Sequence, residues 1–90
     1  MSPRNIPDIL ITIGSLIDQG RVHEAYSLTM EVFQNGYSPT EKVRVAMAFG
    51  GLLTQVYGLR VATELYNALS EGRVDVVTVI LKQAEPEQKT

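Results

Sequence analysis

The chain has 90 residues, the size of one small domain, and its hydrophobic content of 44% is too high for a disordered chain. It has no cysteine and one histidine, which excludes a disulfide framework, a thiol nucleophile and the usual metal sites built from several Cys or His ligands. Ten acidic and eight basic residues give a formal net charge of −2, which argues against nucleic acid as a partner, because proteins that bind it usually carry a basic face.

The first predicted helix runs from about Asn5 to Gln19. Asn5 is suited to cap it, and Pro7 has the backbone angle of a first helical turn. Apolar side chains follow at the spacing of three and four residues that gives one buried face: Ile6, Ile9, Leu10, Ile13, Leu16 and Ile17. Gly20 then ends the helix, since glycine adopts the left-handed conformation at little cost.

A second helix is predicted over residues 21–34, with Asn35 and Gly36 after it. Its apolar stripe includes Val22, Ala25, Leu28 and Val32. Only one or two residues separate it from the first helix. The two helices are therefore expected to form an antiparallel hairpin.

The third helix has the clearest start signal in the sequence. Ser38, Pro39 and Glu41 fit an N-cap, the first helical position and the acidic member of a capping box. The helix is predicted to continue to Tyr57 and to end at Gly58. No charged residue occurs between Val45 and Leu59, and apolar residues occupy more than one side. Such a helix is either central in the fold or in contact with a partner.

A fourth helix is predicted over residues 59–70, followed by Gly72. Residues 73–83 fit a helix by their spacing, but their β-branched residues also favour a strand. We prefer the helix, because the preceding chain is helical and provides no other strand to pair with. The expected organisation is one domain over residues 1–83 and a flexible polar tail over residues 84–90.

A weak internal repeat links the two halves. Residues 14–19 align with residues 50–55 at an offset of 36, and Gly36 aligns with Gly72 at the same offset. The glycines inside helices, Gly14, Gly50 and Gly51, are expected where two helices pack closely, because each costs about 1 kcal/mol relative to alanine. A period in the mid-thirties is typical of helical-hairpin repeats.

The second unit resembles a tetratricopeptide repeat through Gly50, Ala62 and Tyr66, which match its small, small and aromatic positions. Val74 departs from the usual proline, and Ala46 from the usual tryptophan. The first unit is more similar to a pentatricopeptide repeat, through residues 20–25, Leu28, Gly36 and Pro39. The resemblance implies an all-α fold, a short right-handed stack of antiparallel helix hairpins with about two and a half repeats. An unrelated helical bundle is the alternative.

No catalytic constellation is present. His23 lacks the partners of a catalytic histidine, and Glu71 and Asp75 are expected to be solvated. We therefore expect no enzyme activity, no cofactor, no metal and no small-molecule substrate. RNA reading is disfavoured because Leu10 or Ile11, at the position that reads a base in pentatricopeptide repeats, is apolar. No apolar run approaches the roughly 18 residues that cross a membrane, and no signal peptide is evident, so a cytoplasmic protein is expected.

The apolar surplus of the third helix suggests a groove for a partner. The candidate groove residues come from three helices: Ile13, Ile17, Met30, Val45, Phe49, Leu52, Val56 and Tyr57. Such a surface accepts an amphipathic helix, and methionine suits adaptable binding faces. Which apolar residues of the third helix belong to the core and which to the groove stays open from the sequence.

A short helical-hairpin protein with an acidic pI and no catalytic residues resembles the needle-subunit chaperones of type III secretion. This resemblance implies that the groove holds an amphipathic helix of the needle subunit, that a small helical co-chaperone takes part, and that premature polymerisation is prevented. The alternative is a generic helical adaptor or regulator, including one that forms a homodimer through the third helix.

Overall fold

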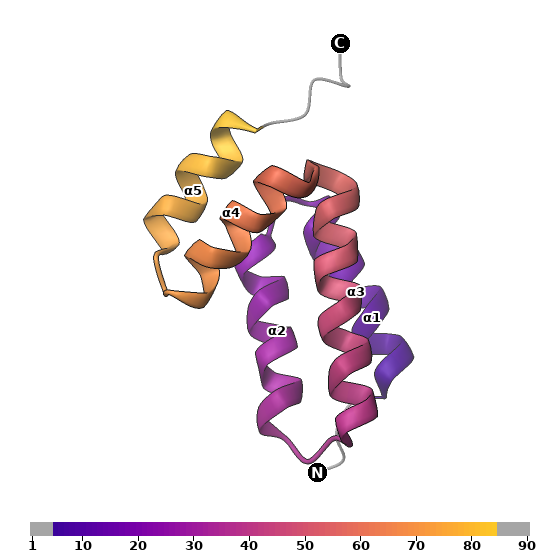
Figure 1. The fold of residues 1–90 in the computed structure, drawn as a ribbon. Coiled ribbons are helices and arrows are strands. Elements are labelled where there is room, and N and C mark those ends of the chain that lie inside the picture. The colour runs from indigo at the N-terminus through magenta and orange to yellow at the C-terminus, as the bar shows by residue number, and fades with distance from the viewer. Residues whose placement is uncertain (1–4, 85–90) are drawn as a thin grey trace.

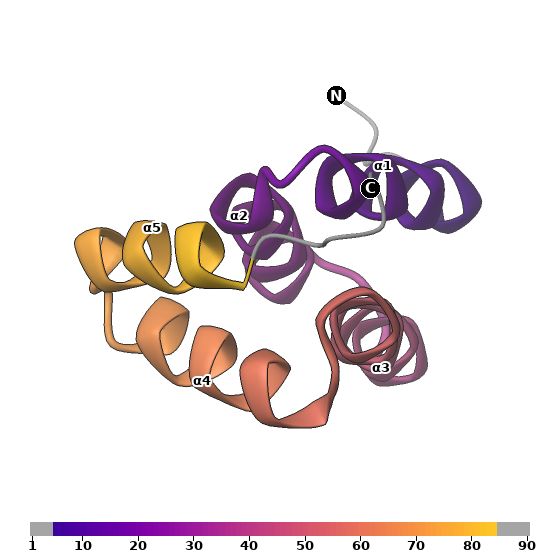
Figure 2. The same ribbon diagram turned by 90° about the horizontal axis from the view of Figure 1, so that it is seen from above.

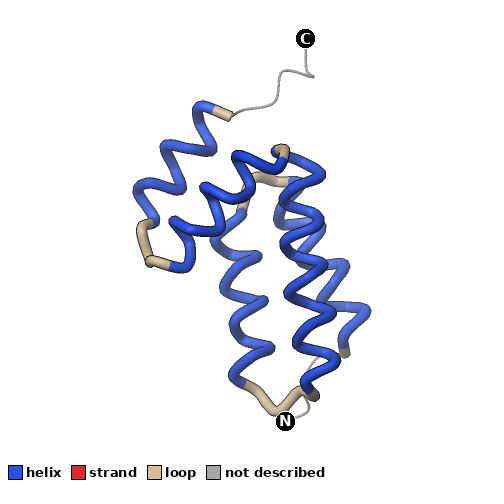
Figure 3. The backbone as a smooth tube through the Cα atoms, in the orientation of Figure 1, coloured by secondary structure: helices blue, strands red, loops and turns tan. Residues whose placement is uncertain are grey.

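The computed structural model describes residues 5–84, and within them it contains five helices and no strand (Figures 1 and 3). The helices are α1 (Ile6–Asp18), α2 (Val22–Gln34), α3 (Pro39–Tyr57), α4 (Leu59–Ser70) and α5 (Val74–Gln83). The all-α prediction is confirmed, and the last segment is a helix rather than a strand. Ala84 is the C-cap of α5, and the rest of the predicted flexible tail, 85–90, lies outside the described residues.

Two helices begin where the sequence places their caps. The Asn5 side chain accepts a hydrogen bond from the backbone N–H of Asp8 at 3.1 Å. At α3 the capping box is complete: Ser38 Oγ accepts from the N–H of Glu41 at 3.2 Å, and the Glu41 carboxylate accepts from the N–H of Ser38 at 3.0 Å. These bonds satisfy N–H groups that a helix start leaves without a partner.

Two of the joints between helices have the same hydrogen bonds. After α1 the N–H of Arg21 bonds the carbonyl of Leu16 at 2.8 Å, and that of Gly20 bonds Ile17 at 3.0 Å. After α4 the N–H of Arg73 bonds Ala68 at 2.9 Å, and that of Gly72 bonds Leu69 at 3.1 Å. Each pair is the Schellman motif, which needs a left-handed residue; Gly20 has φ 79° and Gly72 has φ 74°.

The joint at Gly36, which the 36-residue repeat aligns with Gly72, is built differently. Asn35 caps α2 with φ −122° and ψ 82°, and its side-chain amide donates to the carbonyl of Glu31 at 2.6 Å. The backbone match therefore relates the joint at Gly20, rather than the one at Gly36, to the joint at Gly72.

The core lies where α3 packs against both α1 and α2 and where α4 packs against α3. Its residues form one apolar cluster: Ile6, Ile9, Ile13, Ile17, Val22, Ala25, Leu28, Val32, Val45, Phe49, Leu53, Ala62, Leu65, Ala68, Leu69 and Val77. Thr29 is the buried polar side chain among the described residues, and its hydroxyl donates to the carbonyl of Ala25 at 2.9 Å. Its polar group is thus satisfied inside the core.

Helix α5 lies beside α4, at the end of the molecule away from α1 (Figure 2). It packs against α4 and contributes one fully buried side chain, Val77. It has no comparable contact with α3. The two hairpins before it, α1–α2 and α3–α4, pack through α3, so the described chain is a four-helix body with α5 attached to one helix.

Candidate functional site

Four of the eight predicted groove residues belong to the core. Ile13, Ile17, Val45 and Phe49 are each at most 1% exposed. They lie on the inward stripes of α1 and α3, where these two helices pack together. Their side chains fill the interior and offer no surface to a partner. Val45 and Phe49 of α3 therefore belong to the core, which the spacing of apolar residues alone did not decide.

Of the other four candidates, Leu52, Val56 and Tyr57 lie in the last turns of α3, whereas Met30 lies apart from them on α2. Leu52 faces α1, with Cδ1 3.8 Å from the position a Cβ would take at Gly14. Tyr57 lies at the same side, and burial together with the charge of Asp18 raises the pKa of its hydroxyl. Val56 is partly exposed, and Met30 lies on α2. The predicted single groove around α3 is therefore not assembled from these residues.

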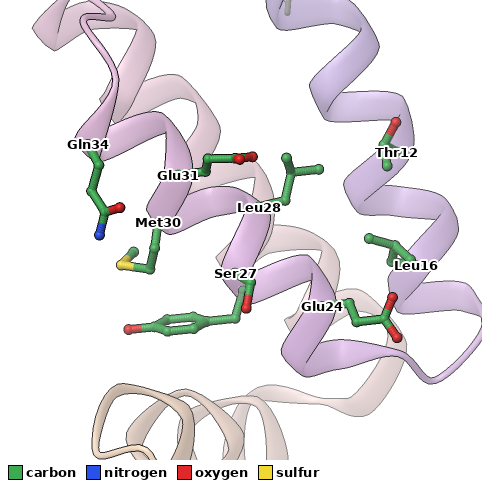
Figure 4. A pocket seen from close by; sticks show the side chains of 9 residues that line it. Thr12, Leu16, Glu24, Ser27, Leu28, Met30, Glu31 and Gln34 are labelled. Carbon is green, nitrogen blue, oxygen red and sulfur yellow. The ribbon is translucent and has the colours of Figure 1, made fainter.

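Met30 belongs to an open hollow that follows α2, with a volume of about 690 Å³ (Figure 4). On one side Leu28 points toward α1, which carries Thr12 and Leu16. Met30 extends from the other side of α2, away from α1. The remaining residues of the hollow also come from α2: Glu24, Tyr26, Ser27, Glu31 and Gln34. The hollow thus combines apolar side chains with an acidic rim.

The rim carboxylates differ in their partners. Glu24 accepts a hydrogen bond from Arg21 at 2.6 Å, and this bond lowers the pKa of Glu24. The Glu31 side chain makes no hydrogen bond or ion pair with any residue from 5 to 84. Because Arg21 already neutralises part of the charge of Glu24, Glu31 is the stronger attractor for a positive group from outside.

Tyr26 links the hollow to the core. Its ring centroid lies 5.9 Å from that of Phe49 on α3 and 6.1 Å from that of Tyr66 on α4. Burial raises the pKa of the Tyr26 hydroxyl. The tilted and edge-on geometries are those that aromatic pairs prefer. These ring contacts join α2 to α3 and α4 beside Met30, so this side of the hollow is backed by packed aromatic side chains.

A second surface lies on the outer side of α3. Val43 is 55% exposed and Met47 is 70% exposed. The expectation of close helix packing is wrong at Gly50 and Gly51, because no atom lies within 4 Å of a Cβ built at either position. Gly14 does face another helix, but at ordinary van der Waals distance from Leu52. Helix α3 is therefore apolar on an exposed side as well as on its core side.

The described residues, 5–84, hold no group of three or more Asp, Glu, His or Cys side chains placed to bind a metal ion. The same stretch contains no helix with the length and apolar character needed to cross a membrane. Its buried side-chain nitrogen and oxygen atoms all have hydrogen-bond partners. The hollow along α2 and the outer side of α3 are two surfaces of this part of the chain that present apolar side chains.

Comparison with protein-family models, with curated proteins and with solved structures finds no match to this chain.

Proposed function

We propose that the protein binds an amphipathic helix of another protein in the hollow along α2. The observation that carries this proposal is an open hollow that extends across α2 from Leu16, beside α1, to Met30 on the other side of the helix, with the carboxylates of Glu24 and Glu31 between them. An apolar hollow of this kind suits the apolar face of a helix. The flexible thioether of Met30 adapts to side chains of different shape.

The acidic rim gives the expected partner a charge pattern. Glu24 and Glu31 are seven residues apart on the same side of α2, which corresponds to about 10 Å along the helix axis. A partner helix with Lys or Arg two turns apart, beside its apolar stripe, would match both carboxylates. Each ion pair at an exposed rim contributes little affinity by itself, but a helix with glutamates at the same positions would be repelled, so the rim determines specificity through the difference between the two helices.

The more specific form of the proposal is a cytoplasmic chaperone of a type III secretion system. In this form the bound helix belongs to the needle subunit, a small helical co-chaperone completes the complex, and polymerisation in the cytoplasm is prevented. It rests on the resemblance to tetratricopeptide-like stacks, which the packing of α1–α2 against α3–α4 through α3 supports. A generic helical adaptor or regulator is the second candidate, favoured by the exposed apolar side of α3.

Binding can be measured by fluorescence anisotropy with synthetic amphipathic helices that share one apolar face and differ only in their flanking charges. We expect the helix flanked by lysines to bind more tightly than the one flanked by glutamates. Met30→Glu should weaken binding at least about tenfold, because it places a charge among apolar contacts. Met47→Glu, on the outer side of α3, is the matched control and should leave the affinity unchanged.

Equal loss of binding in both methionine variants, or equal affinity for both flanking charges, would contradict the assignment of the hollow. The chaperone form has its own test. Co-expression with a needle subunit should yield a soluble complex of fixed stoichiometry, and the Met30→Glu variant should not. A needle subunit that polymerises equally with and without this protein would contradict the chaperone and leave the general helix-binding proposal to the anisotropy experiment.

A further inference from the structure

We infer that two copies of this chain associate through the outer side of α3, with the two helices antiparallel and Met47 of each copy packed over Gly51 of the other. This surface is distinct from the hollow along α2, and the inference does not depend on the proposed function.

The outer side of α3 has the composition of a contact surface. Val43, Met47 and Gly51 recur every four residues and form one ridge along the helix. Val43 and Met47 are largely exposed. Arg44 also lies on this side of α3, but from Val45 to its end the helix carries no charged side chain, so burial of Met47 and Gly51 would desolvate no charge of their own helix turns.

The two glycines have no explanation within the described chain. Each lowers helix stability relative to alanine, yet no atom comes within 4 Å of a Cβ built at Gly50 or Gly51. Together they leave a shallow gap in the ridge. A large exposed side chain, Met47, lies one helical turn before this gap. The ridge therefore presents a projecting side chain and, one turn later, positions without a side chain.

A projection and a gap on the same ridge are complementary to a second copy of that ridge. When two such helices run antiparallel about a two-fold axis between positions 47 and 51, each Met47 meets the gap of the other copy. The same contact is then made twice, as in an isologous dimer. Ridges of residues four apart pack into each other at a crossing angle of about −50°, the commonest class for helix pairs.

Charge supports the antiparallel orientation. Arg44 makes no ion pair or hydrogen bond with any residue from 5 to 84 and lies two turns before Gly51 on the same side of α3. In this register it would reach the last turns of α3 in the second copy, near Thr54. The last turn of α3 contains no basic side chain of its own. A cation is favourable there, because the carbonyl groups at a helix C-terminus carry partial negative charge.

The size of the surface sets the expected strength. A standard stable interface buries about 800 Å² per partner, and one face of a single helix provides less than this. We therefore expect a reversible dimer with a dissociation constant in the micromolar range, rather than an obligate one.

Sedimentation equilibrium over a concentration series tests the association. The wild-type mass should rise from 9.9 kDa toward twice that value as the concentration increases to about 100 μM. Gly51→Leu should weaken association at least about tenfold, because it fills the gap, while the melting temperature of the monomer stays the same or rises. Asn67→Leu, at an exposed position on α4, is the matched control and should dimerise like the wild type.

Cross-linking tests the register. The chain has no cysteine, so introduced cysteines report on chosen positions only. A mixture of the Met47→Cys and Gly51→Cys variants should form a mixed disulfide dimer faster than either variant forms a dimer with itself. A wild-type chain that stays monomeric over the whole series would overturn the inference. Unchanged dimerisation of Gly51→Leu, or preferential linkage of Met47→Cys to itself, would overturn it as well.

Discussion

At the scale of single residues, the glycines of α3 and of its end have opposite roles. Gly50 lies in a helical turn with open space around a built Cβ, whereas Gly58 has φ 89°, a conformation that residues with a side chain rarely adopt. We predict that Gly50→Ala raises the free energy of unfolding by about 1 kcal/mol and that Gly58→Ala lowers it by a similar amount. Urea denaturation at low protein concentration measures both. A loss of stability in Gly50→Ala would show that another part of the chain packs there.

Tyr57 is expected to make the stability of the fold depend on pH under alkaline conditions. Its pKa is raised by burial and by Asp18, so the folded state holds this proton more tightly than the unfolded state does. The resulting stability is present below the unfolded pKa of about 10 and is lost as the pH rises through the folded value. We predict a smaller drop in stability above about pH 10 for Tyr57→Phe than for the wild type. Identical urea midpoints of the two proteins over this range would contradict the prediction.

The residues of the candidate site were harder to predict than the helices that carry them. Periodicity identified α3 as apolar on several sides, but two stripes within one helix do not tell which one a neighbouring helix will cover. Val45 and Phe49 are the covered stripe, and Val43 and Met47 are the exposed one. The decision depends on the direction from which α1 and α2 approach, and no local pattern contains that information.

At the scale of helices, the contribution of the capping box at the start of α3 to the stability of the fold can be measured by itself. Ser38→Ala removes the acceptor for the N–H of Glu41, and we predict a loss of about 1 kcal/mol in the free energy of unfolding. Thr40→Ala, at an exposed position in the first turn, should have a much smaller effect. Thermal denaturation followed by circular dichroism compares the two. Equal effects would mean that general helix propensity, rather than the cap, accounts for the loss.

The helix ends were predictable for a physical reason. Asn5 and Ser38 satisfy N–H groups of the first turn, and Gly20, Gly58 and Gly72 take backbone angles that other residues avoid. Both effects act within a few residues, so the sequence states them directly. The β-branched residues of α5 favour a strand locally, but no described strand is available to pair with, and packing on α4 retains the helix.

At the scale of the whole molecule, α5 should be the least stable of the five helices. Its main contact is with one helix, α4, and it buries one side chain fully, whereas α1 packs against both α2 and α3. We predict that amide hydrogens of α5 exchange with solvent faster than those of α1, because local opening of α5 exposes little apolar surface. Hydrogen exchange followed by NMR measures this difference. Equal protection in the two helices would show that α5 unfolds together with the core.

The packing of α5 could not be predicted from the sequence repeat. The offset of 36 residues predicted a third unit that continues the stack, but α5 packs on α4 without a comparable contact to α3. A repeat in sequence records which residues recur, whereas the stacking of repeats depends on the direction in which each joint turns the chain. That direction is a property of the backbone at a few residues and is not visible in the alignment.

The matching joints after α1 and α4 show that one backbone geometry is reached from two different sequences. Residues 16–21 read Leu-Ile-Asp-Gln-Gly-Arg and residues 68–73 read Ala-Leu-Ser-Glu-Gly-Arg, yet both give the same two hydrogen bonds. Only the glycine and the arginine are identical between them, so the geometry requires little beyond the glycine. The hydrogen-bond pattern of such a turn thus tolerates different residues at the other four positions, whereas the core restricts their size: Ile17 and Ala68 are both buried, but they fill spaces of different volume.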